Sequence, residues 1–358
     1  MVDLRIGSLV TDPGIPARLI AERFNRHTFW CGQSGSGKTY ALGVVLEQLL
    51  ISTALPIVVF DPNADFVKIA EVRQSDPDAA TLASRNLRVL ASGTADPLLI
   101  RMRSMSIASK AAMLRIDPLN DRAEYNAMLH VEELFNLDDP RGIDEQLFAS
   151  ADPVHHALAQ RIENLGLMNW EIWAGNRPTA SDIIAERPDA TILNLSGFDY
   201  VDEPLVIALA VLEDLWNHRE ERRPVLLVID EAHNLCSPDL TSPAAIAVRD
   251  LIGRIAAEGR KYGLWLLLST QRPSKIHPAI LSQCDNLALM KMNSPLDLDE
   301  IGKLFGYVPE ALLRRSPGFL QGQALFAGGF IADASMLQMR DRITAEGGRD
   351  VPVPIRSV

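Results

Sequence analysis

The sequence predicts an α/β protein in which helices cover both faces of a mostly parallel sheet. Three observations support this fold class: short apolar runs, helical patterns between them, and a Gly-rich segment directly after the first run. The runs are continuous rather than alternating, which is typical of strands buried on both faces. Because strands and helices alternate along the chain, a doubly wound sheet is favoured over separate all-α or all-β layers.

The expected strands are bounded by Gly, Pro, Asp or Asn. They are Thr28–Cys31, Pro56–Phe60, Thr191–Leu195, Val225–Ile229, Leu264–Ser269 and Leu287–Met292. The expected helices between them are Tyr40–Leu50, Val201–Asn217 and Pro243–Arg260. In the last of these, Val248, Leu251, Ile252 and Ile255 recur at helical spacing, so one face of this helix should be buried.

Two further regions differ from this pattern within what we expect to be a single domain spanning residues 1–358. Residues 66–188 should form a mostly helical insertion, with long helical stretches at Ser104–Leu114 and Asp121–Leu137. Residues 322–358 should form a C-terminal hairpin and an extended strap. In that hairpin, strands Gln323–Ala327 and Phe330–Ala334 would flank a Gly-Gly turn.

Composition excludes several classes of protein. The 358 residues are 47% hydrophobic and 23% charged, as in folded soluble proteins, which excludes a disordered or collagen-like chain. The three cysteines are far apart and lack CxxC spacing, so neither a disulfide framework nor a zinc site is supported. No apolar stretch approaches the ~20 residues that span a bilayer, and we expect a cytoplasmic protein. The net charge of −11, taken alone, argues against a nucleic-acid partner.

The segment GQSGSGKT matches the phosphate-binding pattern GxxxxGK[ST] at every fixed position and lies between an expected strand and an expected helix. Its residues are Gly32, Gln33, Ser34, Gly35, Ser36, Gly37, Lys38 and Thr39. In such a loop, backbone N–H groups point at phosphate oxygens at a helix N-terminus. Lys38 would reach the β- and γ-phosphates, and the Thr39 hydroxyl would bind Mg²⁺. A chance match has odds of roughly 1%, so the sequence predicts a P-loop NTPase that binds ATP.

Two acids follow the expected strand Val225–Ile229. At the carboxyl edge of a parallel sheet they would lie beside the phosphate loop. Asp230 would hold Mg²⁺ through its water shell, and Glu231 would act as general base for the attacking water. Acids that merely cap a following helix are the competing interpretation.

Further motifs resemble the HerA/FtsK superfamily of hexameric DNA-pumping ATPases, on the HerA side. They are DEAHN at 230–234, EGRKYG at 258–263, STQRPSKIHPAILSQCDN at 269–286, VVFDPNAD at 58–65 and GQALFAGGF at 322–330. The similarity covers roughly residues 25–345. It implies a RecA-like ATPase core that assembles into a ring, most simply a homohexamer, and that uses ATP hydrolysis to move along or unwind DNA.

The resemblance also implies roles for single residues. Gln271 would sense the γ-phosphate or position the water. Arg260 or Lys261 would reach the ATP of a neighbouring subunit as an arginine finger, with Arg254 a weaker candidate; basic residues that satisfy a helix C-terminus are the alternative. Asp61, with Asp65 close behind it, would orient water or Mg²⁺, or else form only an Asp-Pro turn.

Two histidines lie within these motifs. His233 and His277 have no metal-ligand constellation around them in the sequence, so we expect both to be structural.

One departure from the HerA pattern leaves the partner open. HerA translocases usually carry a β-barrel before the ATPase core, and the residues up to Arg26 are too few for one, so we expect a nearly bare motor domain. An ATPase scaffold that assembles with and activates a nuclease or another effector, as in bacterial anti-phage defence, is therefore the alternative function. The candidate DNA contacts are Arg101, Arg103, Lys110 and Lys275, for which an ordinary solvated surface is the competing interpretation.

Overall fold

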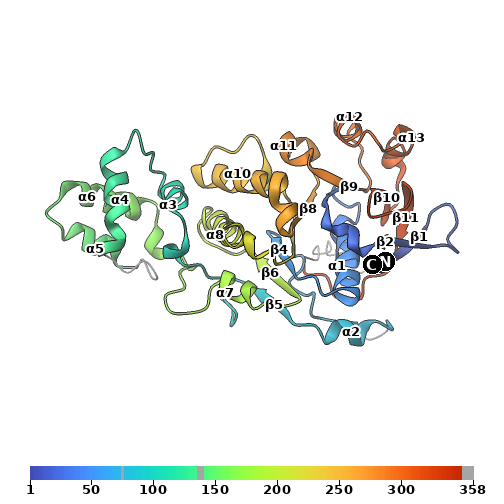
Figure 1. Cartoon of the computed structure of the whole chain (residues 1–358), viewed down its shortest axis with the longest axis horizontal. Coiled ribbons are helices and arrows are strands. Elements are labelled where there is room, and N and C mark those ends of the chain that lie inside the picture. The colour runs from blue at the N-terminus through green and yellow to red at the C-terminus, as the bar shows by residue number, and fades with distance from the viewer. Residues whose placement is uncertain (74–75, 135–140, 349–358) are drawn as a thin grey trace, which may run out of the picture.

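A computed structural model describes residues 1–73, 76–134 and 141–348. In this part of the chain the strands form one 11-stranded sheet with the order β2-β1-β11-β10-β9-β3-β8-β7-β4-β6-β5 (Figure 1). The strands are β1 (Asp3–Leu9), β2 (Pro16–Ile20), β3 (His27–Cys31), β4 (Ile57–Asp61), β5 (Leu87–Leu90), β6 (Ala190–Asn194), β7 (Val225–Ile229), β8 (Leu264–Thr270), β9 (Cys284–Leu289), β10 (Gln323–Gly328) and β11 (Ser335–Met339).

The sheet has a parallel part and an antiparallel edge. Strands β3 to β9 pair in parallel, whereas β10, β11, β1 and β2 add antiparallel strands beside β9. A mostly parallel sheet with helices on its faces is the P-loop NTPase fold that the sequence predicted, and this prediction is confirmed.

Both faces of the parallel part are buried. Along β4, Val58 and Phe60 belong to one hydrophobic core, and the alternate residues Ile57 and Val59 belong to the other. Each residue of such a strand needs an apolar side chain, which explains why the strands appear in the sequence as continuous runs.

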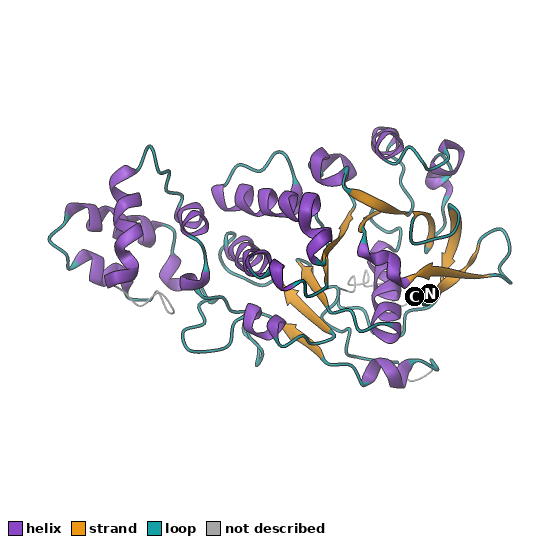
Figure 2. Cartoon of the chain, in the orientation of Figure 1, coloured by secondary structure: helices purple, strands orange, loops and turns teal. Residues whose placement is uncertain are grey.

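Helices cover both faces of the sheet (Figure 2). Those on one side, α1 (Lys38–Ser52) and α2 (Ala79–Ala83), pack in one core; α8 (Glu203–Asn217) and α10 (Pro243–Glu258) pack in the other. The remaining α-helices are α3 (Ile107–Leu114), α4 (Arg122–Leu134), α5 (Ile143–Phe148), α6 (Pro153–Asn164), α7 (Ala180–Ala185), α9 (His233–Cys236), α11 (Pro278–Leu281), α12 (Pro295–Leu304) and α13 (Glu310–Leu313).

Helices α3 to α6, which we call the helical lobe, lie at one end of the molecule, away from α1 (Figure 1). This lobe is narrower than the predicted insertion 66–188, because β5 falls within that interval and pairs with β6 in the sheet. Strand β5 has only four residues and includes Arg88, so its apolar pattern is weak. Part of the expected helix Asp121–Leu137 lies outside the described residues, as does the expected strap after residue 348.

The second strand of the C-terminal hairpin was predicted at the wrong position. Residues 330–334 form the connection, and β11 begins at Ser335. Phe330 leaves the strand geometry because its ring packs against Phe24 and Phe326 and its N–H donates to the Asn286 side chain. The N-terminal strands β1 and β2 were not predicted at all, although β1 pairs with β11.

No helix in residues 1–73, 76–134 or 141–348 is both long and apolar enough to cross a membrane.

Candidate active site

The loop between β3 and α1 depends on its glycines. A Cβ on Gly32 would lie 2.7 Å from the Met290 Cβ and 2.8 Å from the Ser36 Oγ, so this position has no room for a side chain. Gly35 and Gly37 have φ of +76° and +85°, in the left-handed region that glycine adopts freely. Because α1 begins at Lys38 without a side-chain cap, its first N–H groups remain available to an anion.

The strand order brings distant acids to this loop. Strand β8 lies between β3 and β7, so the residues that follow β7 reach the start of α1. The Lys38 Nζ is 2.9 Å from Asp230 Oδ1, 3.2 Å from Glu231 Oε1 and 2.9 Å from the hydroxyl of Ser269. Ser269 in turn donates to Asp230 Oδ1 over 2.6 Å. No role was predicted for Ser269 from the sequence, although it begins the motif that contains Gln271.

The buried Lys38 remains charged. Burial lowers the pKa of the Lys38 ammonium, but the charges of Asp230 and Glu231 outweigh burial and hold that pKa above its ordinary value. Lys38 therefore neutralises charge on the two acids that follow β7.

Glu231 has an unusual backbone and two side-chain partners. Its φ of +44° is rare for a residue with a side chain, and the turn is held by the Ala232 N–H, which donates to the Ser269 carbonyl over 2.7 Å. Its carboxylate lies 3.2 Å from Lys38 Nζ and 3.2 Å from His233 Nδ1. Burial raises the pKa of Glu231, but the His233 contact and the Lys38 charge outweigh it, so the pKa is below its ordinary value. A carboxylate that stays ionised can accept a proton from water.

His233 was expected to be structural, and the structure places it beside Glu231. Its Nδ1 is also 3.1 Å from the Thr270 hydroxyl. The signal that could have identified it is its position two residues after Glu231 at the end of a buried strand. The other histidine of these motifs, His277, caps α11 by accepting the Ala279 N–H over 3.2 Å.

The phosphate loop forms one wall of a cavity of about 750 Å³, which Thr39, Glu231 and Gln271 also line. The opposite wall comes from the C-terminal residues Gln321–Gly322 and Gln338–Asp341. This wall was not predicted, because its residues are some 300 positions from the loop in sequence.

A buried ion pair and hydrogen bonds fix the C-terminal segment to the helix that follows the phosphate loop. Glu47 of α1 accepts the Ile343 and Thr344 N–H groups, each over 2.9 Å, and pairs with Arg342 over 3.2 Å. A Cβ on Gly43 would lie 2.6 Å from the Arg342 guanidinium, so α1 has a glycine where this side chain passes. Arg340 pairs with Asp76.

Three acids gather behind Lys38. One oxygen each from Asp61, Asp65 and Asp230 lies within 4.8 Å of the others. Burial, opposed by backbone hydrogen bonds, raises the pKa of Asp61 to about 6; burial and the Asp230 charge raise that of Asp65 to about 7. Carboxylate oxygens are the donors that Mg²⁺ and similar hard cations prefer, so these residues fit a divalent cation.

The three cations expected to include the arginine finger lie away from this cavity. Arg260 follows α10, near the opposite end of β8 from Gln271, and pairs with Asp285 over 2.5 Å. Lys261 is exposed and lies 3.7 Å from Glu258. The Arg254 guanidinium lies 5.9 Å from the Trp216 ring. Their assignment to a neighbouring subunit's ATP therefore stays a prediction.

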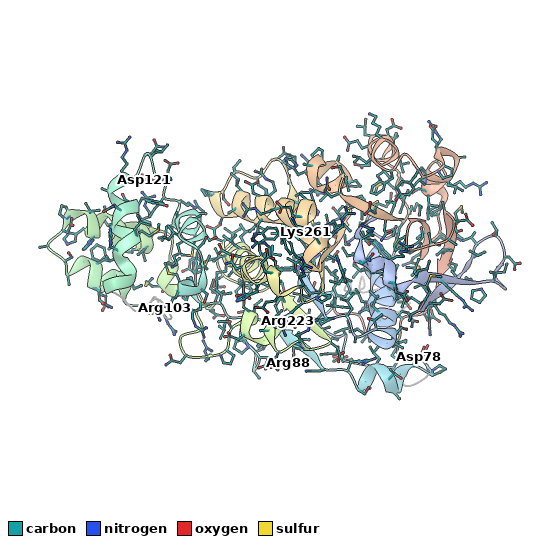
Figure 3. The ribbon with its side chains drawn as sticks, viewed as in Figure 1. Asp78, Arg88, Arg103, Asp121, Arg223 and Lys261 are labelled. Carbon is teal, nitrogen blue, oxygen red and sulfur yellow. The ribbon has the colours of Figure 1, made fainter. Side chains whose placement is uncertain are left out.

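The candidate DNA contacts differ from one another. Lys110 is only 4% exposed, so the expectation that it contacts DNA is wrong in this structure. Arg101 is tied to Asp182 over 3.4 Å, and Lys275 to Asp239 over 2.7 Å. Arg103 is exposed where the helical lobe joins the rest of the chain (Figure 3).

Comparison with known proteins identifies the family. Residues 4–212, more than half of the chain, match the family model described as the central domain of the helicase HerA. The chain belongs to the HerA central-domain family. It is thus a HerA-type ATPase, and the family prediction made from its motifs is confirmed.

The HerA-type relatives match nearly the whole chain. A probable helicase of Methanocaldococcus jannaschii is 25% identical over 97% of this chain and 69% of its own length. The DNA double-strand break repair helicase HerA of Pyrococcus furiosus is 22% identical over 91% of this chain and 67% of its own. The chain thus spans about two thirds of the length of these relatives.

Solved structures share the fold. VirB4 of Thermoanaerobacter pseudethanolicus superposes with a TM-score of 0.59, at 18% identity, over 94% of this chain and 96% of its own. The bacterial conjugative coupling protein TrwB superposes with a TM-score of 0.55, at 15% identity, over 97% and 91% of the two chains. Both similarities concern the fold alone.

Proposed function

We propose that this HerA-type chain is the motor of a ring, most simply a homohexamer, that couples ATP hydrolysis to movement along or unwinding of DNA. The observation that supports this most is the convergence of Lys38, Glu231 and Gln271 on the cavity beside the phosphate loop. The DNA substrate is proposed by analogy with the Pyrococcus furiosus relative, a DNA double-strand break repair helicase.

In the proposed reaction, the loop of residues 32–39 binds the phosphates of ATP. Lys38 leaves Asp230 and Glu231 and moves to the β- and γ-phosphate oxygens, because the phosphates offer it more negative charge. Thr39, and Asp230 through a water molecule, would hold Mg²⁺, which would neutralise charge on the phosphates when bound. Glu231, held by His233, accepts the proton of the attacking water, and Gln271 orients that water.

A neighbouring subunit would complete each site. Arg260, or Lys261 beside it, would stabilise the charge that develops on the transferred phosphoryl group. In its own chain Arg260 lies near the opposite end of β8 from Gln271, which agrees with such a role in trans. Hydrolysis would then depend on contact between subunits, as movement of a ring along DNA requires.

The test is DNA-stimulated ATP hydrolysis together with displacement of streptavidin from biotinylated duplex DNA. We expect the wild-type chain to show both activities and Lys38→Ala to lose roughly 100-fold or more of the hydrolysis rate, as when a charge-stabilising group is removed. Lys303→Ala, which removes an exposed lysine of α12, is the matched control and should behave as wild type. Hydrolysis that DNA does not stimulate, with no displacement, would contradict the motor.

A second candidate function is an ATPase subunit that assembles with a nuclease or another effector protein. The helical lobe favours it, because residues 107–164 contain 11 Asp or Glu and 5 Lys or Arg. An acidic surface repels the phosphates of DNA and suits a protein partner. Co-purification of an effector whose activity requires ATP binding by this chain, with ATPase activity indifferent to DNA, would support this function over the motor.

A further inference from the structure

Four carboxylates meet at the centre of the molecule, and Lys38 pairs with two of them. Asp61 and Asp230 are 0% and 2% exposed, and Glu231 is 8% exposed. Asp65 is partly buried and lines the same cavity as Glu231. Buried charges of one sign are costly unless a counter-charge is close, so this site has an excess of negative charge.

The loop after β4 is built to hold two of these acids together. Asp61 Oδ1 accepts the Asp65 N–H over 3.0 Å, and Asp61 Oδ2 accepts the Phe66 N–H over 2.8 Å. Ala64 has a φ of +59°, which turns the chain so that Asp65 faces back toward Asp61. The Asp-Pro turn and the acidic site are therefore the same structure rather than alternatives.

The C-terminal segment packs against this loop from outside. The Gly347 N–H donates to the Asp65 carbonyl over 3.1 Å. A Cβ on Gly348 would lie 2.3 Å from Asp65 Oδ1, and a Cβ on Gly347 would lie 1.9 Å from the Ala64 carbonyl oxygen. Asp65 is thus held in place on both sides.

The third acid has an oxygen without a partner. Asp230 Oδ1 is engaged by Lys38 and Ser269, whereas Asp230 Oδ2 is buried and accepts no hydrogen bond from any residue that the structure describes. A buried carboxylate oxygen with no donor is rare in a folded protein, and a bound ion is one explanation for it. Oxygens of Asp61, Asp65 and Asp230 lie within 4.8 Å of one another, and three carboxylates are a donor set that suits a divalent cation.

We propose that Asp61, Asp65 and Asp230 bind a divalent cation such as Mg²⁺ or Mn²⁺ directly, in the chain that holds no nucleotide. The purpose of this site rests on the proposed ATPase function, which it deepens: Asp61 and Asp65 add two metal ligands to the Thr39 and Asp230 pair expected with ATP. When Lys38 moves to the phosphates, the acids that it neutralised would keep a positive counter-charge.

The experiment is a titration of the nucleotide-free chain with Mn²⁺, following the electron paramagnetic resonance signal of free Mn²⁺. We expect one site per chain at pH 8. Asp65→Asn should weaken Mn²⁺ binding ~10-fold or more, the range seen when support for a metal ligand is lost. Asp65→Glu keeps the carboxylate and should restore part of the affinity.

Two control variants show whether a loss of Mn²⁺ binding is specific to these three acids. Glu310→Gln removes an exposed charge far from the cluster and should leave Mn²⁺ binding unchanged. Thr39→Ala removes a ligand expected only with ATP, so it should keep nucleotide-free Mn²⁺ binding. If Asp65→Asn does not fold, as judged by circular dichroism, Asp65→Ser replaces it.

Three results would overturn the proposal: no Mn²⁺ binding by the folded wild-type chain, equal binding by Asp65→Asn, or an equal loss in Thr39→Ala. The failure of the proposed function is a different observation. A chain that binds Mn²⁺ but hydrolyses no ATP would contradict the ATPase mechanism, whereas a chain that hydrolyses ATP without binding Mn²⁺ alone would contradict only the metal site.

Discussion

Lys38 shows how one residue prepares this site for its ligand. The lysine pairs with Asp230 at 2.9 Å and with Glu231 at 3.2 Å. In the proposed reaction it leaves both to bind phosphate, and nucleotide binding would then release Glu231 from its cationic partner. His233, 3.2 Å from Glu231, then remains to orient the carboxylate.

Glu231→Gln should bind ATP with near wild-type affinity and lose roughly 100-fold or more in kcat, because the amide cannot accept a proton from water. Single-turnover hydrolysis and equilibrium binding of a fluorescent ATP analogue measure the two effects separately. Full turnover by this variant would remove Glu231 from the role of general base.

His27, at the start of β3, gives the fold a dependence on pH. Its Nδ1 accepts the Leu266 N–H over 2.9 Å, and its Nε2 lies 3.0 Å from the Ala256 carbonyl, so the neutral ring joins β3, β8 and α10. Burial, reinforced by the charge of Arg260, lowers the pKa of His27 to about 4. A depressed pKa means that this stabilisation is complete above about pH 6.5 and is lost as the pH falls toward 4.

Between pH 7.5 and 5 the free energy of unfolding should therefore fall by about 2 kcal/mol more in the wild type than in His27→Gln, which has no ring to protonate. Urea denaturation of both chains at the two pH values measures this difference. Carboxylates titrate in both chains, so their contribution cancels. Equal losses in the two chains would show that His27 does not govern the acid response.

At the scale of elements, the helix after the phosphate loop and the C-terminal segment form one unit. Glu47 of α1 accepts hydrogen bonds from residues 343 and 344 and pairs with Arg342 in the core. Because Arg340 precedes these contacts and lines the cavity, the position of the cavity wall depends on Glu47.

Glu47→Ala should cost about 3 kcal/mol or more in the free energy of unfolding, because it leaves the Arg342 guanidinium buried without its partner. It should also speed trypsin cleavage after Arg340 and Arg342. Urea denaturation and timed proteolysis measure the two effects. Glu310→Ala, at an exposed helical pair, is the control and should cost less than about 0.5 kcal/mol. If Glu47→Ala is as stable and as resistant to trypsin as the control, Glu47 does not fix the C-terminal segment to α1.

Strands with an apolar pattern of their own could be predicted from the sequence, whereas strands that depend on a distant partner could not. Strand β7 was predicted with its observed bounds, and β3, β4, β6, β8 and β9 to within a few residues, because strands buried on both faces are apolar along most of their length. The parallel edge strand β5, which has only four residues and includes Arg88, was missed. Strands β1 and β11 were missed or misplaced because each is stabilised by pairing with the other, and this partnership leaves little mark on either local sequence.

Part of the candidate site could likewise be predicted from the sequence, and part could not. The phosphate loop and the Asp-Glu pair are contiguous motifs whose chemistry can be inferred from a few residues. The wall at 338–341 and the contacts of Glu47 with residues 342–344 can be known only from the fold. The contact of His233 with Glu231 lies within one short motif and could have been suspected from the sequence. The metal-binding potential of Asp65 could be suspected from its motif, but not its proximity to Asp230.

At the scale of the whole molecule, the net charge of −11 is unevenly distributed. Residues 107–164 account for more than half of it by sequence, and Asp121 lies in the helical lobe at one end of the molecule (Figure 3). The rest of the chain is closer to neutral, so the overall charge gives no argument against a DNA path elsewhere on the surface.

If each ATP site is shared by two neighbouring subunits, a mixture of two inactive variants should recover activity. Arg260→Ala and Glu231→Gln should each be inactive, yet a mixture of the two should recover activity. In a randomly mixed ring about one quarter of the interfaces pair an intact Glu231 with an intact Arg260 from the neighbour. ATP hydrolysis by the mixed chains, compared with each chain alone, measures the recovery.

Lys38→Ala mixed with Glu231→Gln is the control for that experiment. Both variants damage the same half of the site, so their mixture should stay inactive. Mixtures that contain Lys261→Ala or Arg254→Ala in place of Arg260→Ala identify which cation acts in trans. No recovery in any mixture would argue that each chain works alone.

The pairing of β1 with β11 constrains how the protein is made. Strand β1 takes its place in the sheet beside β11, with Gly7 opposite Met339. The hairpin of β1 and β2 therefore cannot dock on the sheet until more than 300 further residues have been synthesised. The cavity wall at 338–341 arrives with β11, so a nascent chain that already has its phosphate loop cannot complete the cavity before residue 341 has left the ribosome.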